Sequence, residues 1–189
     1  MSKALSFPDA LPILRGDEVC LRELTEADIP AWFERATDAE SADLAGDPIP
    51  GSIDEGTAWL SRQRDHFGRQ AALRWAIVPK GGTASVGTVG LTFSMQDARI
   101  AKFGIVIARA SWGKGLGTSS ARMVRDYAFG TLGLRELHAE ALQRNLRSTR
   151  LLQKVGFQLL RTIPASPESE GDSEDCVFYV LPNPGQRAA

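Results

Sequence analysis

The chain has 189 residues, a length that suits one domain with a real hydrophobic core. Hydrophobic residues make up 43% and charged residues 24%, as in soluble globular proteins, and the formal net charge of −1 gives no electrostatic reason to expect a nucleic-acid or anionic-membrane partner. No apolar run approaches the roughly 20 residues that span a bilayer, and prolines interrupt the N-terminus, so we expect neither a membrane helix nor a signal peptide.

The two cysteines, Cys20 and Cys176, stand far apart in the chain and form no C-x-x-C pair. This spacing fits neither a zinc site nor a disulfide framework. We therefore expect two reduced thiols, a cytoplasmic location and no bound metal.

The regular patterns of strands and helices predict one domain over residues 18–182. Before it, residues 1–17 are interrupted by prolines and mixed in polarity, and we interpret them as a lead-in. Residues 183–189 would form a short C-terminal tail.

The first half of the chain begins with a strand and then two helices. Alternating polarity predicts the strand at Val19–Leu24, and Thr25 with Asp28 three residues later is a signal for the start of a helix that runs to about Asp38. Prolines and glycines predict a loop from Ala42 to Ser52. The other elements expected here are a helix from Ser52 to about His66 or Gln70 and a hairpin of strands at Trp75–Val78 and Ser85–Phe93.

The second half begins with a strand at Phe103–Ala108, a glycine-rich turn and a helix from about Thr118. The elements expected after it are a strand at Leu137–Ala141, a helix from Asn145 to Val155, strands at Phe157–Thr162 and Cys176–Leu181, and a solvated loop at Pro164–Asp175 between these two strands. The order β-α-α-β-β-β-α-β-α-β-β predicts an α/β fold, a mixed sheet with helices on both faces.

The glycine-rich turn has the chemistry of an anion site. Gly113, Gly115 and Gly117 stand at alternate positions, where they permit positive φ angles and a close approach of a ligand to the backbone. The N–H groups that follow open a helix, at the positive end of its dipole. Such a site suits a phosphate, and Lys114 within the turn would add a positive charge.

Other glycine motifs fit this turn less well. A P-loop is excluded, because Lys114 is followed by Gly115 and position 108 is not glycine. A dinucleotide fingerprint fails at Thr118, its third glycine position, although Glu140 stands about 20 residues on, where a ribose-binding acid would stand. The motif also lies too late in the chain for a doubly wound sheet. A plain strand-to-helix turn stays a structural alternative.

The stretch Trp112-Gly113-Lys114-Gly115-Leu116-Gly117 resembles the acetyl-CoA pyrophosphate loop, Q/R-x-x-G-x-G/A, of the GCN5-related N-acetyltransferases. Its Trp-Gly-Lys-Gly form resembles the RimJ/RimL-like branch of that family. The resemblance extends from about Val19 to Leu181 and implies the splayed mixed sheet of the GNAT fold. It implies acetyl-CoA as a co-substrate and transfer of the acetyl group to a primary amine.

The resemblance also implies which residues hold the cofactor. The strand segment Ile105, Val106 and Ile107 would splay from the strand at Leu137–Ala141 and offer unpaired backbone groups to the pantetheine arm. The residues that would present N–H groups to the pyrophosphate are Trp112, Gly113, Lys114, Gly115, Leu116, Gly117 and Thr118. Asn145 matches a second cofactor segment; it is also a good helix N-cap, and the two roles are compatible.

The catalytic candidates are Ser148 and Glu140. Ser148 matches a serine that is a candidate proton donor to the thiolate in the resembled branch, or it is an ordinary serine of a first helical turn. Glu140 is a candidate base, directly or through water, or simply a strand acid. Two residues depart from the family: Leu152 stands where many members have a tyrosine acid, and Lys102 where branch members often have a glutamate.

The amine acceptor would be a protein N-terminus or a small amine. The loops Ala42–Gly56 and Pro164–Asp175 would frame its site, and their acids would either attract a cationic amine or simply be solvated. A homodimer is compatible with this reading. Two alternatives stay open: a non-catalytic acyl-CoA-binding module, because two family side chains are missing, and a dinucleotide-binding oxidoreductase.

Overall fold

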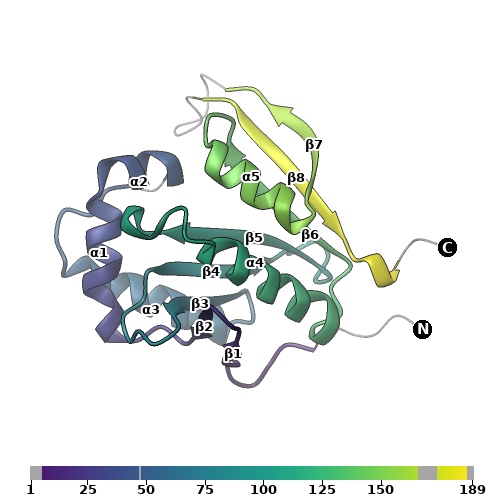
Figure 1. Cartoon of the computed structure of the whole chain (residues 1–189). Helices are drawn as coiled ribbons and strands as arrows, with labels where there is room; N and C mark the ends of the chain where they lie inside the picture. The colour runs from purple at the N-terminus through teal and green to yellow at the C-terminus, as the bar shows by residue number, and fades with distance from the viewer. Residues whose placement is uncertain (1–5, 47, 166–173, 187–189) are drawn as a thin grey trace.

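The computed structural model describes residues 6–46, 48–165 and 174–186. Within them, eight strands form one sheet in the order β1-β2-β3-β4-β5-β6-β8-β7 (Figure 1). The strands are β1 (Leu14–Arg15), β2 (Val19–Arg22), β3 (Ala72–Pro79), β4 (Gly87–Phe93), β5 (Ile100–Ile107), β6 (Glu136–Leu142), β7 (Gln158–Ile163) and β8 (Cys176–Pro182). The helices are α1 (Ile29–Thr37), α2 (Ala39–Ala45), α3 (Glu55–Gly68), α4 (Leu116–Asp126) and α5 (Leu146–Val155).

Helices cover both faces of this sheet, as the sequence predicts (Figure 1). The face under α4 and α5 carries the main core, because alternate strand residues point to the same side. Members of this core include Leu73, Trp75, Val89, Leu91, Phe103, Leu137, Val124, Leu152 and Val155. On the opposite face, Leu24, Leu60 and Ala76 pack with Ile29 and Trp59 and so attach α1 and α3.

The sheet opens between β5 and β6. These strands are parallel and pair at three positions only, which are Ile100↔Glu136, Ala101↔Leu137 and Lys102↔His138. Beyond Lys102, β5 stays paired with β4 and β6 stays paired with β8. The strands β6, β8 and β7 therefore diverge from the rest of the sheet toward α2 (Figure 1). This opening, which we call the splay, confirms the splayed sheet expected from the sequence.

Two elements were not predicted. Leu14 and Arg15, placed in the lead-in, pair with Leu21 and Cys20 as β1. Part of the predicted loop, from Ala42 to Ala45, is the end of helix α2. Helix α2 has its own start and stop signals, because the side chain of Asp38 accepts a hydrogen bond from Ser41 N (2.8 Å) and Gly46 ends the helix with φ 68°.

Helix α4 starts at Leu116, two residues before the predicted start at Thr118, and continues into a π-helical turn, Tyr127–Thr131. The N-cap of α4 is Gly115, whose φ of 80° is a left-handed conformation that favours glycine. The glycine turn thus sets the start of the helix, and the helix lies against the splay.

Candidate active site

The glycine turn leaves a run of backbone N–H groups without a protein partner. Gly113 and Gly115 have φ angles of 74° and 80°, which direct the chain around a tight turn into α4. No side chain caps α4, and the first helical hydrogen bond is donated by Ser119 N to Gly115 O (3.0 Å). Among the described residues, no atom accepts a hydrogen bond from the N–H groups of Gly113 to Thr118. These groups are free to bind an anion.

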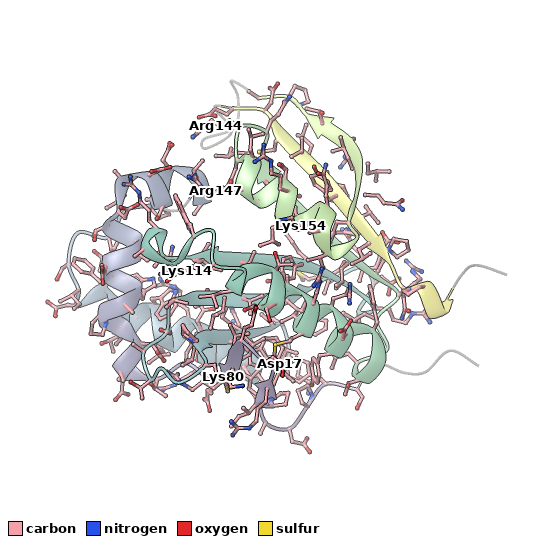
Figure 2. All side chains as sticks on the ribbon, viewed as in Figure 1. Asp17, Lys80, Lys114, Arg144, Arg147 and Lys154 are labelled. Atoms are coloured by element: carbon pink, nitrogen blue, oxygen red, sulfur yellow. The ribbon has the colours of Figure 1, made fainter. Side chains whose placement is uncertain are left out.

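Gly117 lies where α4, α5 and β5 meet. A Cβ atom on it would be 2.8 Å from Leu151 Cδ1 and 3.0 Å from Ile107 Cδ1, so only glycine lets the three elements approach so closely. The first turn of α4 is therefore in contact with both sides of the splay. Figure 2 shows Lys114 at the turn between β5 and α4.

Trp112 has a structural role in addition to its place before the turn. Its indole Nε1 donates to Ile107 O (2.7 Å), and the Arg147 guanidinium lies 4.2 Å from the centre of its ring. The Trp112 main-chain N–H donates to Arg109 O (3.1 Å) and so is not one of the groups free for a ligand. The side chain instead joins the end of β5 to α5.

The strand segment Ile105–Ile107 lies along the splay. It pairs with β4 through Val89↔Ile105 and Gly87↔Ile107, and its other edge has no strand partner among the described residues. In an antiparallel pair, alternate residues direct N–H and C=O groups away from the partner strand. Backbone groups of β5 that pair with no strand therefore line the splay, as the resemblance implies, although Ile107 O already accepts from Trp112 Nε1.

Asn145 caps α5 and connects it to α2. Its Oδ1 accepts from Ser148 N (3.0 Å), which confirms the predicted N-cap, and its Nδ2 donates to Leu44 O (3.1 Å). Both polar atoms of this side chain are thus used within the protein. A contact between Asn145 and a cofactor stays a prediction.

Ser148 lies on the side of α5 that faces the core. Leu151, Leu152 and Val155, which follow it at helical spacing, pack into the main core. Ser148 is half-buried at the outer end of this stripe, and among the described residues its hydroxyl has no hydrogen-bond partner. Leu152 is buried, so the position that holds a tyrosine in many relatives is apolar here.

Glu140 forms an ion pair with Lys102 across the closed end of the splay. His138 and Glu140 lie on the face of β6 opposite the core, as strand alternation predicts. The His138 ring contacts the Glu136 carboxylate and stands edge-on to Phe178, 5.0 Å between ring centres. The Lys102 ammonium thus binds one carboxylate oxygen of Glu140, the candidate base. The sequence alone does not predict this ion pair, because it depends on the register between β5 and β6.

Helix α2 is held against α5 by charged side chains that the sequence analysis did not single out. Arg144 donates to both carboxylate oxygens of Asp43 (2.7 and 2.9 Å) and also pairs with Glu174, and these two partners raise its pKa. Glu40 pairs with Arg147 (3.3 Å) and Arg109 (3.2 Å). Arg144, in the turn before α5, and Arg147, in the first turn of α5, lie at the end of α5 nearest α2 (Figure 2).

The described acids that would frame an acceptor site are already engaged. Glu55 Oε1 accepts from Gly51 N (2.8 Å) at the start of α3, and Asp175 Oδ1 accepts from Ala165 N (2.9 Å). Asp43 and Glu174 both bind Arg144. Asp54 Oδ2 accepts from Ser52 Oγ (3.2 Å), and the other loop acids, Asp47, Glu168, Glu170 and Asp172, lie outside the described residues.

Two surface hollows of the described chain lie away from the glycine turn. One is lined by Arg125, Phe129, Val155 and Leu181, and the other by Arg144 and its neighbours. In the described ranges, no three His, Cys, Asp or Glu side chains gather as metal ligands would. No helix of that part of the chain is both long enough and apolar enough to cross a membrane.

A mixed sheet that opens after three residue pairs, with unbonded N–H groups at a helix start beside the opening, is the architecture of the GNAT acetyltransferase fold. The crystal structure of a GNAT-family acetyltransferase from Bacillus anthracis superposes with a TM-score of 0.80 at 14% identity, covering 91% of this chain and 99% of the other. The family model "Acetyltransferase (GNAT) domain" matches residues 18–158, and the chain belongs to the GNAT acetyltransferase family.

Two further comparisons agree with this assignment. The chain is 27% identical over 173 residues to the N-acetyltransferase YoaA of Bacillus subtilis, covering 92% of this chain and 98% of YoaA. It also shares its fold with the spermidine N-acetyltransferase of Vibrio cholerae, solved in complex with CoA and spermine, at a TM-score of 0.75, 20% identity and coverage of 89% and 97%.

Proposed function

We propose that the protein transfers an acetyl group from acetyl-CoA to a primary amine, by direct attack of the amine on the thioester. The observation that carries this proposal is the run of unbonded N–H groups from Gly113 to Thr118 beside the open edge of β5. A diphosphate needs several converging N–H donors at a helix start, and the turn supplies them. Lys114, which is exposed, adds a positive charge.

The direction of β5 supports a position for the rest of the cofactor. The glycine turn follows the C-terminal end of β5, so an arm attached at the turn runs back along the splay from Ile107 toward Ile105. It stops where β5 and β6 rejoin, at Lys102 and His138. The thioester therefore lies near Gly104. Backbone N–H groups on the open edge of β5 are suited to stabilise the oxyanion that forms on its carbonyl oxygen.

The transfer forms a C–N bond and breaks the C–S bond. The neutral amine attacks the carbonyl carbon, and the tetrahedral intermediate expels the CoA thiolate. The amine nitrogen loses a proton to a base, for which Glu140 or a water molecule bound to it is the candidate. The thiolate gains a proton, for which the Ser148 hydroxyl is the candidate donor. The acceptor is a small amine or, as the resemblance to the RimJ/RimL-like branch implies, a protein N-terminus. The enzyme acts in the cytoplasm, as a monomer or a homodimer.

An amine screen with acetyl-CoA tests this function. Intact-mass detection of acetylated products, together with release of the CoA thiol, should identify at least one amine that is turned over. Gly115→Glu and Lys114→Glu should abolish or strongly weaken acetyl-CoA binding in calorimetry, because they place a negative charge against the diphosphate. Ser148→Ala should keep binding and lose turnover. Gly68→Glu, at an open and exposed position at the end of α3, is the matched control and should bind as the wild type does.

A non-catalytic acyl-CoA-binding module is the second candidate. Leu152 stands where many family members have a tyrosine acid. Lys102 stands where branch members often have a glutamate, and its ammonium forms an ion pair with Glu140. Tight binding of acetyl-CoA without turnover of any amine in the screen would favour this module over the enzyme.

A further inference from the structure

The charged side chains are distributed unevenly over the two faces of the sheet. In residues 17–68, which include α1, α2 and α3, acids far outnumber lysines and arginines. In α4 and α5, both described in full, the balance is reversed, and Asp126 is their single acid. Helices α1 and α3 cover one face and α4 and α5 the other (Figure 1). The net charge of −1 therefore conceals an acidic face and a basic face.

The cations of α5 lie on the flank of this helix that faces α4. The two helices touch at Gly117 and Leu151, since a Cβ atom on Gly117 would lie 2.8 Å from Leu151 Cδ1. Arg147 and Lys154 precede and follow Leu151 by about one turn, and Arg150 stands between them on the same flank. Arg147 already has partners. Arg150 and Lys154 are exposed and have no polar partner among the described residues.

Helix α4 and the glycine turn add cations beside the same contact. Arg125 Nη1 donates to Val155 O (3.0 Å), so this side of α4 faces α5. Arg122 lies one turn earlier on that side and is exposed, as is Lys114 in the turn. Neither has a charged or hydrogen-bonding partner within the described part of the chain. The line where α4 meets α5 is thus bordered by unpaired cations, which we call the cationic seam: Lys114, Arg122, Arg150 and Lys154 (Figure 2 labels Lys114 and Lys154).

The fold gives no reason for this concentration of charge. The four side chains are exposed, form no ion pair within the described chain and repel one another. Lys154, in the last turn of α5, also suits the helix dipole, but Arg122 and Arg150 stand in the middle of their helices. A surface of like charges that the fold does not need is suited to attract a ligand of the opposite charge.

The glycine turn lies at one end of the cationic seam, and the inference rests on the function proposed above. Acetyl-CoA carries all its charge at the nucleotide end, on the diphosphate and the 3′-phosphate, whereas its pantetheine arm is neutral. With the arm in the splay and the diphosphate at Gly113–Thr118, the nucleotide stays outside the splay, on the side of α4 and α5. The cationic seam then borders the approach of the charged end.

We propose that the cationic seam captures acetyl-CoA from solution, by long-range attraction of its nucleotide phosphates, and so directs the charged end to the glycine turn. This attraction acts before contact, so it raises the association rate and has little effect on the dissociation rate. The acids of residues 17–68 add to the effect, because a polyanion is repelled from the face of α1 and α3. The surface fits a nucleotide-bearing acyl donor rather than a neutral one.

Stopped-flow measurement of CoA binding at several salt concentrations tests the proposal. The signal is tryptophan fluorescence, to which Trp112 beside the turn contributes. In the wild type, the association rate constant should fall about tenfold or more between 20 mM and 500 mM salt, while the dissociation rate constant stays nearly constant. The double variant Arg150→Glu, Lys154→Glu should associate about tenfold more slowly at low salt, and the difference should disappear at high salt.

The matched control places the same change of net charge on another part of the surface. Arg62 on α3 and Lys80 after β3 are exposed and have no printed contact with α4 or α5. Arg62→Glu, Lys80→Glu should alter the association rate less than about twofold. Dephospho-CoA, which lacks the 3′-phosphate, should associate more slowly than CoA and be less sensitive to Arg150→Glu, Lys154→Glu.

Each other outcome decides against the inference. Association that does not depend on salt overturns it, and so does an equal loss in the seam and control variants, because net charge alone would then act. Faster dissociation with unchanged association would mean direct contact without long-range capture. An oligonucleotide that binds more tightly than CoA, and loses this binding in the seam variant, would assign the surface to nucleic acid.

The same measurements separate this inference from the function on which it rests. If CoA and acetyl-CoA do not bind under any condition, the proposed function and the capture both fail. If CoA binding depends on salt and on the seam as expected, but no amine is acetylated in the screen, the capture stands and the transfer reaction is rejected. If amines are acetylated and the association rate does not depend on salt, only the capture is rejected.

Discussion

Asp28 is the buried charge on which the start of α1 depends. Arg22 donates to both of its carboxylate oxygens (2.7 and 2.9 Å), and Thr25 N donates to one of them (2.9 Å). The Thr25 and Asp28 signal read from the sequence is thus confirmed as a capping interaction. Burial alone would raise the pKa of Asp28, but the hydrogen bonds from Arg22 and Thr25 outweigh it and hold that pKa below its usual value.

This lowered pKa makes stability depend on pH. A carboxylate with a lower pKa in the folded state stabilises the protein above its unfolded pKa of about 3.9, and this stabilisation is lost as the pH falls through the folded value. Asp28→Asn should therefore lower the free energy of unfolding at pH 7 by about 2 kcal/mol, because Arg22 loses its partner in a site that is 2% exposed at Asp28 and 26% at Arg22. Urea unfolding across pH 2–7 measures this.

The same titration carries its own check. Below about pH 4 the difference in stability between wild type and Asp28→Asn should shrink, since the wild-type carboxyl becomes neutral as well. Glu26→Gln is the control: Glu26 is exposed and 3.7 Å from Arg64, so its loss should change the free energy of unfolding by less than about 0.5 kcal/mol. A constant difference at every pH would mean that packing, and not charge, explains the effect of Asp28→Asn.

At the scale of an element, α2 is the part of the fold that sequence reasoning could not supply. Its seven residues are too few for a helical period to be recognised, and its contacts depend on residues about a hundred positions away. The glycine turn and α4 could be predicted, because every signal that defines them lies within the same short stretch. In the candidate site, likewise, the unbonded N–H groups could be predicted because they depend on neighbouring residues. The Lys102–Glu140 pair could not, because it depends on the register between two strands.

We expect the charged pairs between α2 and α5 to hold α2 in place at the open end of the splay. The double variant Asp43→Asn, Glu40→Gln removes the partners of Arg144 and Arg147 on α2 and leaves the core untouched. Hydrogen exchange of the amides at 39–45 should become several-fold faster, while exchange in β3 and β4 stays unchanged. High salt should speed exchange in the wild type in the same direction.

The control for α2 is Asp126→Asn. Asp126 is an exposed acid that pairs with its neighbour Arg125 on α4 and does not contact α2. It should leave exchange at 39–45 as it is in the wild type. If the double variant also leaves that exchange unchanged, the contacts of Asn145 and the packing of α2 on α1 are sufficient to hold the helix.

At the scale of the molecule, the sheet is two half-sheets joined edge to edge at three residue pairs. On one side of the splay are β1 to β5, and on the other are β6, β8, β7 and α5. The described links beyond those pairs include the shared core, the packing of α4 on α5 at Gly117 and Leu151, the contact of Trp112 with Arg147, and the bridges from α2. A ligand that lies along the splay and binds the glycine turn touches both halves, so its binding free energy resists their separation.

Acetyl-CoA should therefore stabilise the whole molecule and protect both edges of the splay. At a hundredfold excess over its Kd the added stability is about 2.7 kcal/mol, which for a chain of this size raises the melting temperature by about 5–10 °C. Hydrogen exchange should slow at residues 105–107 and 113–118 on one side and at 139–142 on the other, with little change in β3. CoA without the acetyl group should do nearly the same, whereas NAD and NADP, which have a diphosphate but no pantetheine arm, should leave residues 105–107 unprotected. If NAD or NADP stabilises the protein and protects these residues while acetyl-CoA does neither, the dinucleotide-binding alternative is favoured instead.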